Sequence, residues 1–203
     1  MQLITERLLL REFRATDWPA VLAYQSDPRY LRYYAWDTRT PDEVRAFVTR
    51  FMAQQEEQPR SKFQLAIELR AEARLIGNCG LRLEAAGARV GEIGYELAPA
   101  YWEQGYATEA ARAMVTLGFA DFQLHRISSY CIADNVASAH VLEKLGMRCE
   151  GRLRENVWMK GRWWDTLLYG ILDREWTRRT GPGPLDPDQC ARDPASATGS
   201  PIP

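Results

Sequence analysis

The sequence predicts an α+β (mixed α/β) domain, built on a single mostly antiparallel mixed sheet of about seven strands with helices on both faces. Two observations support this prediction. Segments with a two-residue period and segments with a helical period alternate along the chain, giving a strand, two helices, three strands, a helix, a strand, a helix and two strands. The central strand–helix–strand unit requires a right-handed crossover, which leaves its two strands parallel.

The bulk composition is that of an ordinary globular protein. The chain has 203 residues, of which 46% are hydrophobic and 26% charged, and a formal net charge of −1. This charge gives no electrostatic reason to expect nucleic acid or an anionic membrane as a partner. The N-terminal segment MQLITERLLLREF carries charges within its apolar run, so we expect neither a signal peptide nor a membrane span.

Cysteine and histidine usage gives no sign of a metal site. The four cysteines are widely spaced and form no CxxC pair, and the chain has only two histidines. We therefore expect no bound metal, reduced thiols and a cytoplasmic location.

The composition changes at Gly181. Proline supplies six of the last 22 residues, and almost nothing apolar remains there to be buried. We therefore predict a folded domain over residues 1–178 and a disordered tail over residues 179–203.

The first third of the chain predicts a strand and two helices. ITERLLLREF (4–13) alternates as a strand does, and Thr16 or Asp17 can cap a short helix after it. The second helix has the stronger signal, because Thr40 and Glu43 have capping-box spacing and Pro41 suits the first helical position.

The rest of the chain supplies the remaining strands and two more helices. Gly146 is placed to end the second of these helices as a C-cap, and Lys160-Gly161 is placed to turn the last hairpin. The predicted strands are 63–69, 73–84, 89–99, 126–133, 147–156 and 164–172, and the predicted helices are 105–122 and 135–146.

The segment WEQGYATEA (102–110) connects a strand that ends at Pro99 to the helix that begins near Tyr106. The first N–H groups of a helix have no partner within the helix, and together with the positive end of the helix dipole they attract an anion. Gly105 and Ala107 are small enough to let a phosphate approach the main chain, and Thr108 adds a hydroxyl donor. The alternative interpretation is an ordinary turn, since neither a Walker loop nor a GxGxxG motif is present.

A second short motif, NVASAHVLEKLGM, begins at Asn135. Ser138 belongs to the inward stripe of the predicted helix, together with Val141, Leu142 and Leu145. Taken alone, Asn135 is an N-cap and Ser138 a small packing residue.

Taken together, these segments resemble the GNAT acetyltransferase superfamily, in the branch of the ribosomal-protein N-terminal acetyltransferases and related small-molecule enzymes. The resemblance extends from TERLLLREF to YGILDREW. It is most specific in IGYELAPAYWEQGYATEA, NVASAHVLEKLGM and EGRLRENVWMKGRWWDTLLYGIL. It implies a GNAT-like fold in which the two central parallel strands splay apart.

The resemblance also implies an N-acetyltransferase that uses acetyl-CoA, releases CoA and acetylates a primary amine on a peptide N-terminus or a small molecule. The turn would hold the CoA pyrophosphate, and the pantetheine arm would lie in the splay between strands 89–99 and 126–133. The residues implied as cofactor contacts are Leu97, Ala98, Gln104, Gly105, Tyr106, Ala107, Thr108, Asn135, Ser138 and Lys144.

Direct attack of a free amine on the thioester needs no protein nucleophile, in agreement with the lack of a Ser/His/Asp or Cys/His signature. A backbone N–H near Leu97 would stabilise the oxyanion, and Ser138 would donate to the departing thiolate. Glu155 and Glu96 are the candidates for the base that accepts the amine proton, although each also fits a surface or salt-bridged glutamate.

The sequence departs from the family pattern at the turn and at the base. Many relatives have Gly in place of Glu103 and Lys or Arg in place of Gln104, so we expect Arg112 or Lys144 to supply the missing positive charge. The glutamate that serves as base in some relatives falls near Val157. Glu155 lies two residues earlier and would share its strand face.

The acceptor pocket is expected between the first two helices and the last hairpin, where segments 27–37 and 155–165 are rich in aromatic residues and arginine. The tryptophans of the second segment, Trp158, Trp163 and Trp164, fit core and interface positions equally well. Strand alternation lets only one of Trp163 and Trp164 face inward, which leaves the other to line a pocket or a homodimer contact.

Two other functions are compatible with the sequence. One is a CoA-binding sensor or interaction module that has little or no turnover. The other is a domain for a nucleotide other than CoA, against which the helix at Asn135 argues.

Overall fold

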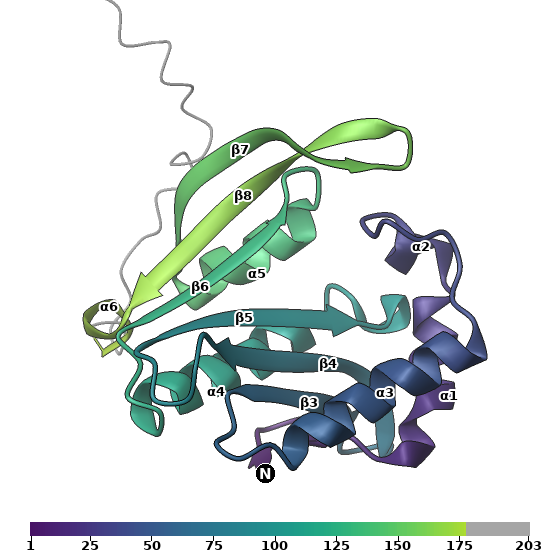
Figure 1. The fold of residues 1–203 in the computed structure, drawn as a ribbon, viewed down its shortest axis with the longest axis horizontal. Helices are drawn as coiled ribbons and strands as arrows, with labels where there is room; N and C mark the ends of the chain where they lie inside the picture. Colours follow the sequence, from purple (N-terminus) through teal and green to yellow (C-terminus); the bar gives the residue numbers. More distant parts are fainter. Residues whose placement is uncertain (178–203) are drawn as a thin grey trace, which may run out of the picture.

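The computed structural model describes residues 1–177, which form one eight-stranded sheet in the order β1-β2-β3-β4-β5-β6-β8-β7 (Figure 1). The predicted tail and Cys190 lie outside the described residues. The strands are β1 Gln2–Ile4, β2 Leu8–Glu12, β3 Lys62–Leu69, β4 Arg74–Leu83, β5 Val90–Leu97, β6 Arg126–Ile132, β7 Arg148–Met159 and β8 Arg162–Leu172. The helices are α1 Trp18–Gln25, α2 Pro28–Leu31, α3 Pro41–Gln55, α4 Tyr106–Ala120, α5 Val136–Leu145 and α6 Asp173–Thr177, with short 3-10 turns at Ala15–Asp17 and Pro99–Tyr101.

The predicted mixed sheet is confirmed, because β5 and β6 are parallel and every other neighbouring pair of strands is antiparallel. The expected number of strands is one too low. The single N-terminal strand is in fact the hairpin β1–β2, whose turn is closed by the Thr5 N–H donating to Leu8 O at 2.9 Å and the Leu8 N–H donating to Thr5 Oγ1 at 3.1 Å. The polar residue Thr5 therefore divides the predicted strand into two.

The boundaries of α3 and α5 follow the expected capping residues, whereas Asp17 precedes α1 without a side-chain capping bond to it. Thr40 and Glu43 form the capping box of α3, with Pro41 at its first position. Asn135 caps α5, which ends at Gly146 with φ of 84°. This left-handed conformation favours glycine.

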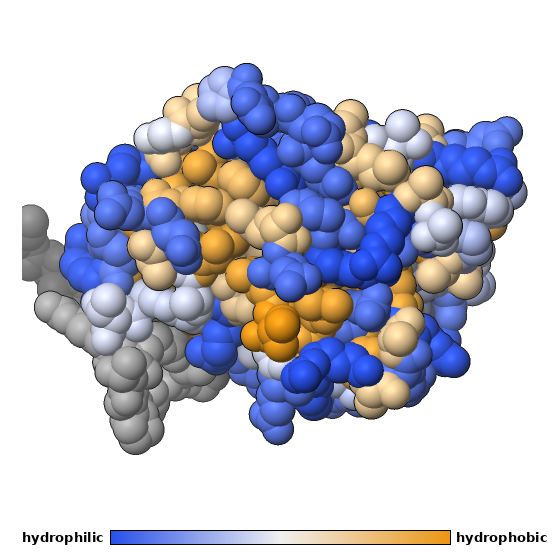
Figure 2. Space-filling view, turned by 90° about the horizontal axis from the view of Figure 1, so that it is seen from below, coloured by the Kyte–Doolittle hydropathy of each residue, from blue (hydrophilic) through white to orange (hydrophobic). Residues whose placement is uncertain are grey.

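Two apolar clusters cover the two faces of the sheet. Helices α1 and α3 lie against one face, with Val21, Val44 and Phe51 in their cluster, and α4 and α5 lie against the other (Figure 1). On the face of the molecule that Figure 2 shows, hydrophobic residues gather in patches between hydrophilic ones. Each face of β5 therefore meets a different layer of helices.

Two further expectations, on membrane spans and on the cysteines, can be compared with the structure of residues 1–177. Within residues 1–177, no helix is long and apolar enough to cross a membrane. Cys79 and Cys131 are free and buried, whereas Cys149 is disulfide-bonded, so the expectation of reduced thiols is wrong at that residue.

Candidate functional site

The two parallel strands diverge as the family resemblance implied. Their ladder pairs Val90–Glu92 with Arg126–Ser128, and the Ser129 hydroxyl then donates to Ile93 O at 2.9 Å. Beyond that point β5 stays with β4 and β6 stays with β8, so the two strands separate toward their carboxyl ends (Figure 1).

At the end of β5, some main-chain groups are already hydrogen-bonded within the protein and others are free to bind a ligand. The Ala98 N–H donates to Ile76 O at 2.7 Å, and Ala98 O accepts the Tyr101 N–H at 2.9 Å. Both groups therefore already have a partner, although the carbonyl oxygen keeps a second lone pair, and the expected contact of Ala98 with a cofactor stays a prediction. Since antiparallel ladder bonds alternate along a strand, the N–H of Leu97 points away from β4 and toward the splay.

The turn before α4 has the geometry of an anion site. Glu103 and Gly105 adopt left-handed φ values of 61° and 82°. The first helical bond runs from the Glu109 N–H to Gly105 O at 3.0 Å, which leaves the N–H groups of Tyr106, Ala107 and Thr108 pointing out of the helix. The side chain of Gln104 instead donates to Ala100 O at 3.1 Å and braces the turn.

Arg7 holds this turn from the other end of the chain. Its Nε donates to Glu109 Oε2 at 2.7 Å, and its Nη1 donates to Gln104 O at 2.9 Å. Its guanidinium also lies 4.3 Å from the centre of the Tyr106 ring. Arg7 is not among the residues predicted from the sequence, because no local pattern links residue 7 to residue 104.

A pocket of about 500 Å³ lies beside the start of α4. Arg112 Nη2 donates to Lys144 O at 3.0 Å, which joins α4 to α5 at this pocket. The two expected compensating cations therefore line the pocket together. Its lining residues are Thr5, Glu6, Gly105, Thr108, Glu109, Arg112, Ala113 and Lys144.

The start of α5 meets β5 through Tyr95. The Tyr95 hydroxyl donates to Ser138 O at 2.9 Å and lies 3.1 Å from Ser138 Oγ. Because the phenol has one proton, the Ser138 hydroxyl donates in the second contact. Asn135 Oδ1 accepts the Ser138 N–H at 3.2 Å, so the N-cap role of Asn135 is confirmed and its amide NH₂ group is not needed for the cap.

Glu96 lies next to Tyr95 in sequence but on the opposite face of the sheet, because side chains alternate along a strand. Its Oε1 accepts the Tyr24 hydroxyl at 2.7 Å, the Gln25 side-chain amide at 3.0 Å and a short bond from Asn78 Nδ2. Its Oε2 accepts a short bond from Tyr30 and a long one from Tyr34 at 3.4 Å. We call Glu96 with these five donors the Glu96 cluster.

The tyrosines of the Glu96 cluster form an aromatic wall. The Tyr30 and Tyr34 rings stack at 4.5 Å, and Trp36 continues the stack at 4.8 Å from Tyr34. Burial, reinforced by the charge of Glu96, raises the pKa values of Tyr24, Tyr30 and Tyr34. These phenols therefore stay protonated as donors to the carboxylate at neutral pH.

A chain of buried amides leads into the Glu96 cluster from β3 and β4. Arg82 Nη2 donates to Gln64 Oε1 at 3.1 Å, and Gln64 Nε2 donates to Asn78 Oδ1 at 2.5 Å. Asn78 Nδ2 is thereby turned toward Glu96. The arginine at the far end thus fixes the direction of every amide in the chain.

Glu155 does not occupy the position expected from strand alternation. Residues 154–156 stand opposite the single residue Asp165 in a bulge of β7, and Glu155 has a left-handed φ of 48°. Its N–H donates to Asp165 Oδ1 at 2.8 Å, and the side chain is exposed. The expectation that Glu155 shares a face with Val157 is therefore wrong.

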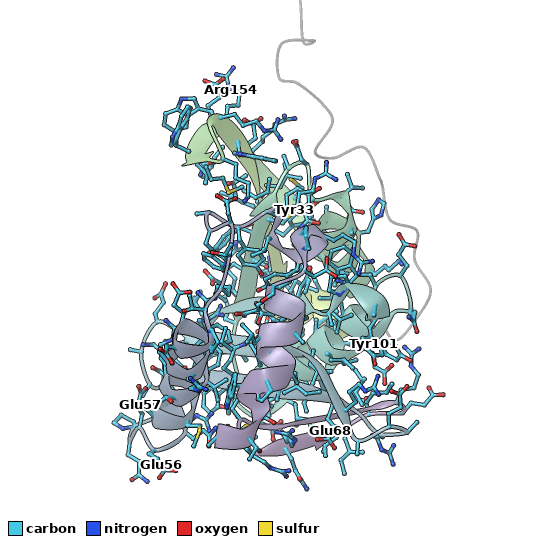
Figure 3. The ribbon with its side chains drawn as sticks, turned by 90° about the vertical axis from the view of Figure 1, so that its right-hand side faces the viewer. Tyr33, Glu56, Glu57, Glu68, Tyr101 and Arg154 are labelled. Atoms are coloured by element: carbon cyan, nitrogen blue, oxygen red, sulfur yellow. The ribbon has the colours of Figure 1, made fainter. Side chains whose placement is uncertain are left out.

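The β7–β8 hairpin arches over the N-terminal end of α5 and reaches toward α2 (Figure 1), and Arg154 in the hairpin lies near the top of the view in Figure 3. Tyr33 donates to Asp134 O at 2.9 Å and meets the Trp164 ring edge-on at 6.0 Å. Trp164 is buried, whereas Trp158 and Trp163 are exposed. The prediction that only one of Trp163 and Trp164 faces inward is confirmed.

Comparisons with known proteins find matches over most of the chain. The model of the acetyltransferase (GNAT) domain matches residues 7–148. The uncharacterized N-acetyltransferase YnaD of Bacillus subtilis is 36% identical over 176 residues, which cover 87% of this chain and 99% of that protein.

Solved structures have the same fold. A GNAT-family acetyltransferase from Bacillus anthracis has a TM-score of 0.75 and 34% identity, over 86% of this chain and 100% of its own. Spermidine N-acetyltransferase from Vibrio cholerae, in complex with CoA and spermine, has a TM-score of 0.72 and 21% identity, over 85% and 99% of the two chains.

Proposed function

Because the chain belongs to the GNAT acetyltransferase family, we propose that it transfers an acetyl group from acetyl-CoA to a primary amine by direct attack on the thioester. The observation that carries the proposal is the divergence of β5 and β6 between two unlike polar clusters. Tyr95 and Ser138 lie on the α4–α5 side of the sheet, and the Glu96 cluster lies on the α1–α3 side. Donor and acceptor would meet in the splay.

The donor set fits acetyl-CoA. The free N–H groups at the start of α4 suit a pyrophosphate, and Arg112 and Lys144 beside them suit a further phosphate. The Leu97 N–H is directed into the splay, where it would stabilise the negative charge that develops on the thioester oxygen. Asn135 retains an amide NH₂ group for the pantetheine arm.

On the other face, Glu96 is our candidate for the base in preference to Glu155. Three donors saturate its Oε1, whereas Oε2 holds one short bond and one long bond, so Oε2 has room to accept the amine proton. The described contact of Glu155 is with Asp165 on the hairpin.

Ser138 is our candidate for stabilising the departing thiolate. Its hydroxyl proton points at Tyr95 Oη, so a small rotation would redirect it to the sulfur while Tyr95 keeps Ser138 in place through its carbonyl. Tyr95 is a second candidate, which the sequence analysis did not identify.

The acceptor is a primary amine of a small molecule or a peptide N-terminus, and the aromatic wall beside Glu96 suits a cationic amine. The rival function, a CoA-binding sensor without turnover, would not need a carboxylate held beside the splay. We also propose a cytoplasmic location. A homodimer, in which the exposed Trp158 and Trp163 would form the contact, belongs to the same proposal.

A thiol-release assay with acetyl-CoA tests this function. The acceptors are benzylamine, tyramine, spermidine, an aminoglycoside, amino acids and short peptides with free N-termini. We expect CoA release with at least one amine, and none with its N-acetylated form. Tight CoA binding by calorimetry without release for any acceptor would contradict acetyl transfer and favour the sensor.

A further inference from the structure

The Glu96 cluster contains one polar atom that its neighbours leave unpaired. Gln25, at the C-terminal end of α1, is 1% exposed, and its Oε1 has no hydrogen-bond partner among the described residues. A buried amide oxygen without a donor costs about 1 to 3 kcal/mol, so such atoms are rare in folded proteins. A ligand that enters the Glu96 cluster and donates to this oxygen would remove that cost.

The orientation of this amide is set by Glu96. The Nε2 group of Gln25 donates to Glu96 Oε1 at 3.0 Å. Flipping the amide would bring its oxygen against the carboxylate, which repels it. Gln25 Oε1 is therefore held as an acceptor next to the Glu96 carboxylate.

A second acceptor site lies on the carboxylate itself. Tyr34 is 3.4 Å from Glu96 Oε2, too long for a strong bond, and an incoming N–H can replace it. Glu96 Oε2 and Gln25 Oε1 thus form a pair of acceptors beside the stacked rings of Tyr30 and Tyr34.

We propose that Gln25 Oε1 and Glu96 Oε2 bind two N–H groups of the acceptor amine and so select primary amines, with Gln25 as the specificity-determining residue. A neutral primary amine keeps two N–H groups when its lone pair attacks, whereas a secondary amine keeps one and leaves one acceptor unpaired. The carbon next to the nitrogen then packs against the tyrosine stack. This inference rests on the proposed amine acetylation.

Calorimetry on the CoA-saturated protein tests the pair directly. The probes are benzylamine, N-methylbenzylamine and N,N-dimethylbenzylamine at pH 7, which are all cations and carry three, two and one N–H groups. Each cation carries one N–H group more than the corresponding neutral amine, so the benzylamine and N-methylbenzylamine cations can both serve two acceptors. We expect these two to bind within about threefold of each other and N,N-dimethylbenzylamine, with one N–H group, about tenfold more weakly.

The substitution Gln25→Met removes the acceptor and nearly keeps the side-chain volume. We expect benzylamine to bind about tenfold more weakly to this variant and the drop at the third probe to disappear. Gln55→Met is the matched control, because Gln55 donates to Phe13 O outside the Glu96 cluster. It should leave all three affinities unchanged.

Several outcomes would overturn the inference. One is a loss of affinity for N,N-dimethylbenzylamine that persists in Gln25→Met, which indicates size exclusion. Another is equal or unmeasurable binding of the three amines to the unmodified protein. If Gln25→Met does not fold, the affinities of the three amines for the unmodified protein still test the inference, because the affinity should fall between the second and the third amine. These readouts are of binding, so the two failures can be told apart. Amine selection without thiol release would contradict the proposed acetyl transfer, whereas thiol release without amine selection would contradict only the roles assigned to Gln25 Oε1 and Glu96 Oε2.

Discussion

Replacing Arg7 by alanine should weaken both the fold and the binding of CoA. Arg7 joins the β1–β2 turn to the start of α4 through Glu109 and Gln104 O, at 2.7 and 2.9 Å. Because the Arg7 side chain is 40% exposed, the ion pair contributes only about 1 kcal/mol. The bond to Gln104 O adds about 1 kcal/mol and the contact with the Tyr106 ring about 0.5 to 1 kcal/mol.

These contributions predict that Arg7→Ala lowers the free energy of unfolding by about 2 to 3 kcal/mol. For a domain of this size the melting temperature should fall by about 5 to 10 °C, which calorimetry measures. The affinity for CoA should fall about five- to tenfold, because the N–H groups of the turn lose their brace and a nearby positive charge. Arg7→Lys should recover part of the charge effect but not the two-point bracing.

The pH dependence gives an independent check on the pair. Burial alone would raise the pKa of Glu109, but hydrogen bonds from Thr5 and Arg7 outweigh it, so the pKa lies below its ordinary value of 4.5. A lowered pKa in the folded state means that the ionised group stabilises the protein above pH 4.5. This stabilisation is lost as the pH falls through the folded pKa. In Arg7→Ala the loss in acid should be smaller.

Arg70→Ala is the matched control, because Arg70 holds the same β1–β2 turn through Thr5 O and Glu6 O without contacting Gln104. It should leave CoA affinity unchanged. If a folded Arg7→Ala protein binds CoA as tightly as the unmodified protein, the bracing role assigned to Arg7 is refuted.

Four further predictions follow from the site. Glu96→Gln should lower kcat at least about 100-fold with CoA affinity kept, and turnover near the unmodified rate would exclude Glu96 as base. Ser138→Ala should lower kcat about tenfold or more and leave CoA affinity near intact; an unchanged kcat would exclude the thiolate role. Glu103→Gly relieves a left-handed φ of 61° and removes an exposed carboxylate, so CoA should bind less than about fivefold more tightly. A larger gain would mean that Glu103 points into the phosphate site. Burial raises the pKa of Cys79 to about 12 and that of Cys131 to about 11. Their alkylation, followed by peptide mass spectrometry, should be slow at pH 7 and should rise with pH as thiolate forms. Rapid alkylation at pH 7 would contradict their burial.

Local signals in the sequence determined much of this protein. Strand alternation, the capping box at Thr40 and the C-cap at Gly146 depend on residues a few positions apart, so a single segment carries each of them. The turn at Gly105, where we propose that an anion binds, and the cap at Asn135 are of the same kind. The resemblance to the GNAT family then supplied the splay between the strands.

The tertiary structure decided which side chains meet. Arg7 and Gln104 are 97 positions apart, and Glu96 gathers Tyr24 from 72 positions away, so only the packing of helices on the sheet brings them together. Glu155 was misplaced because a bulge interrupts the two-residue period of β7, and no local rule predicted its position. Sequence periodicity records which face a residue occupies, whereas the chemistry of this site depends on contacts between distant segments.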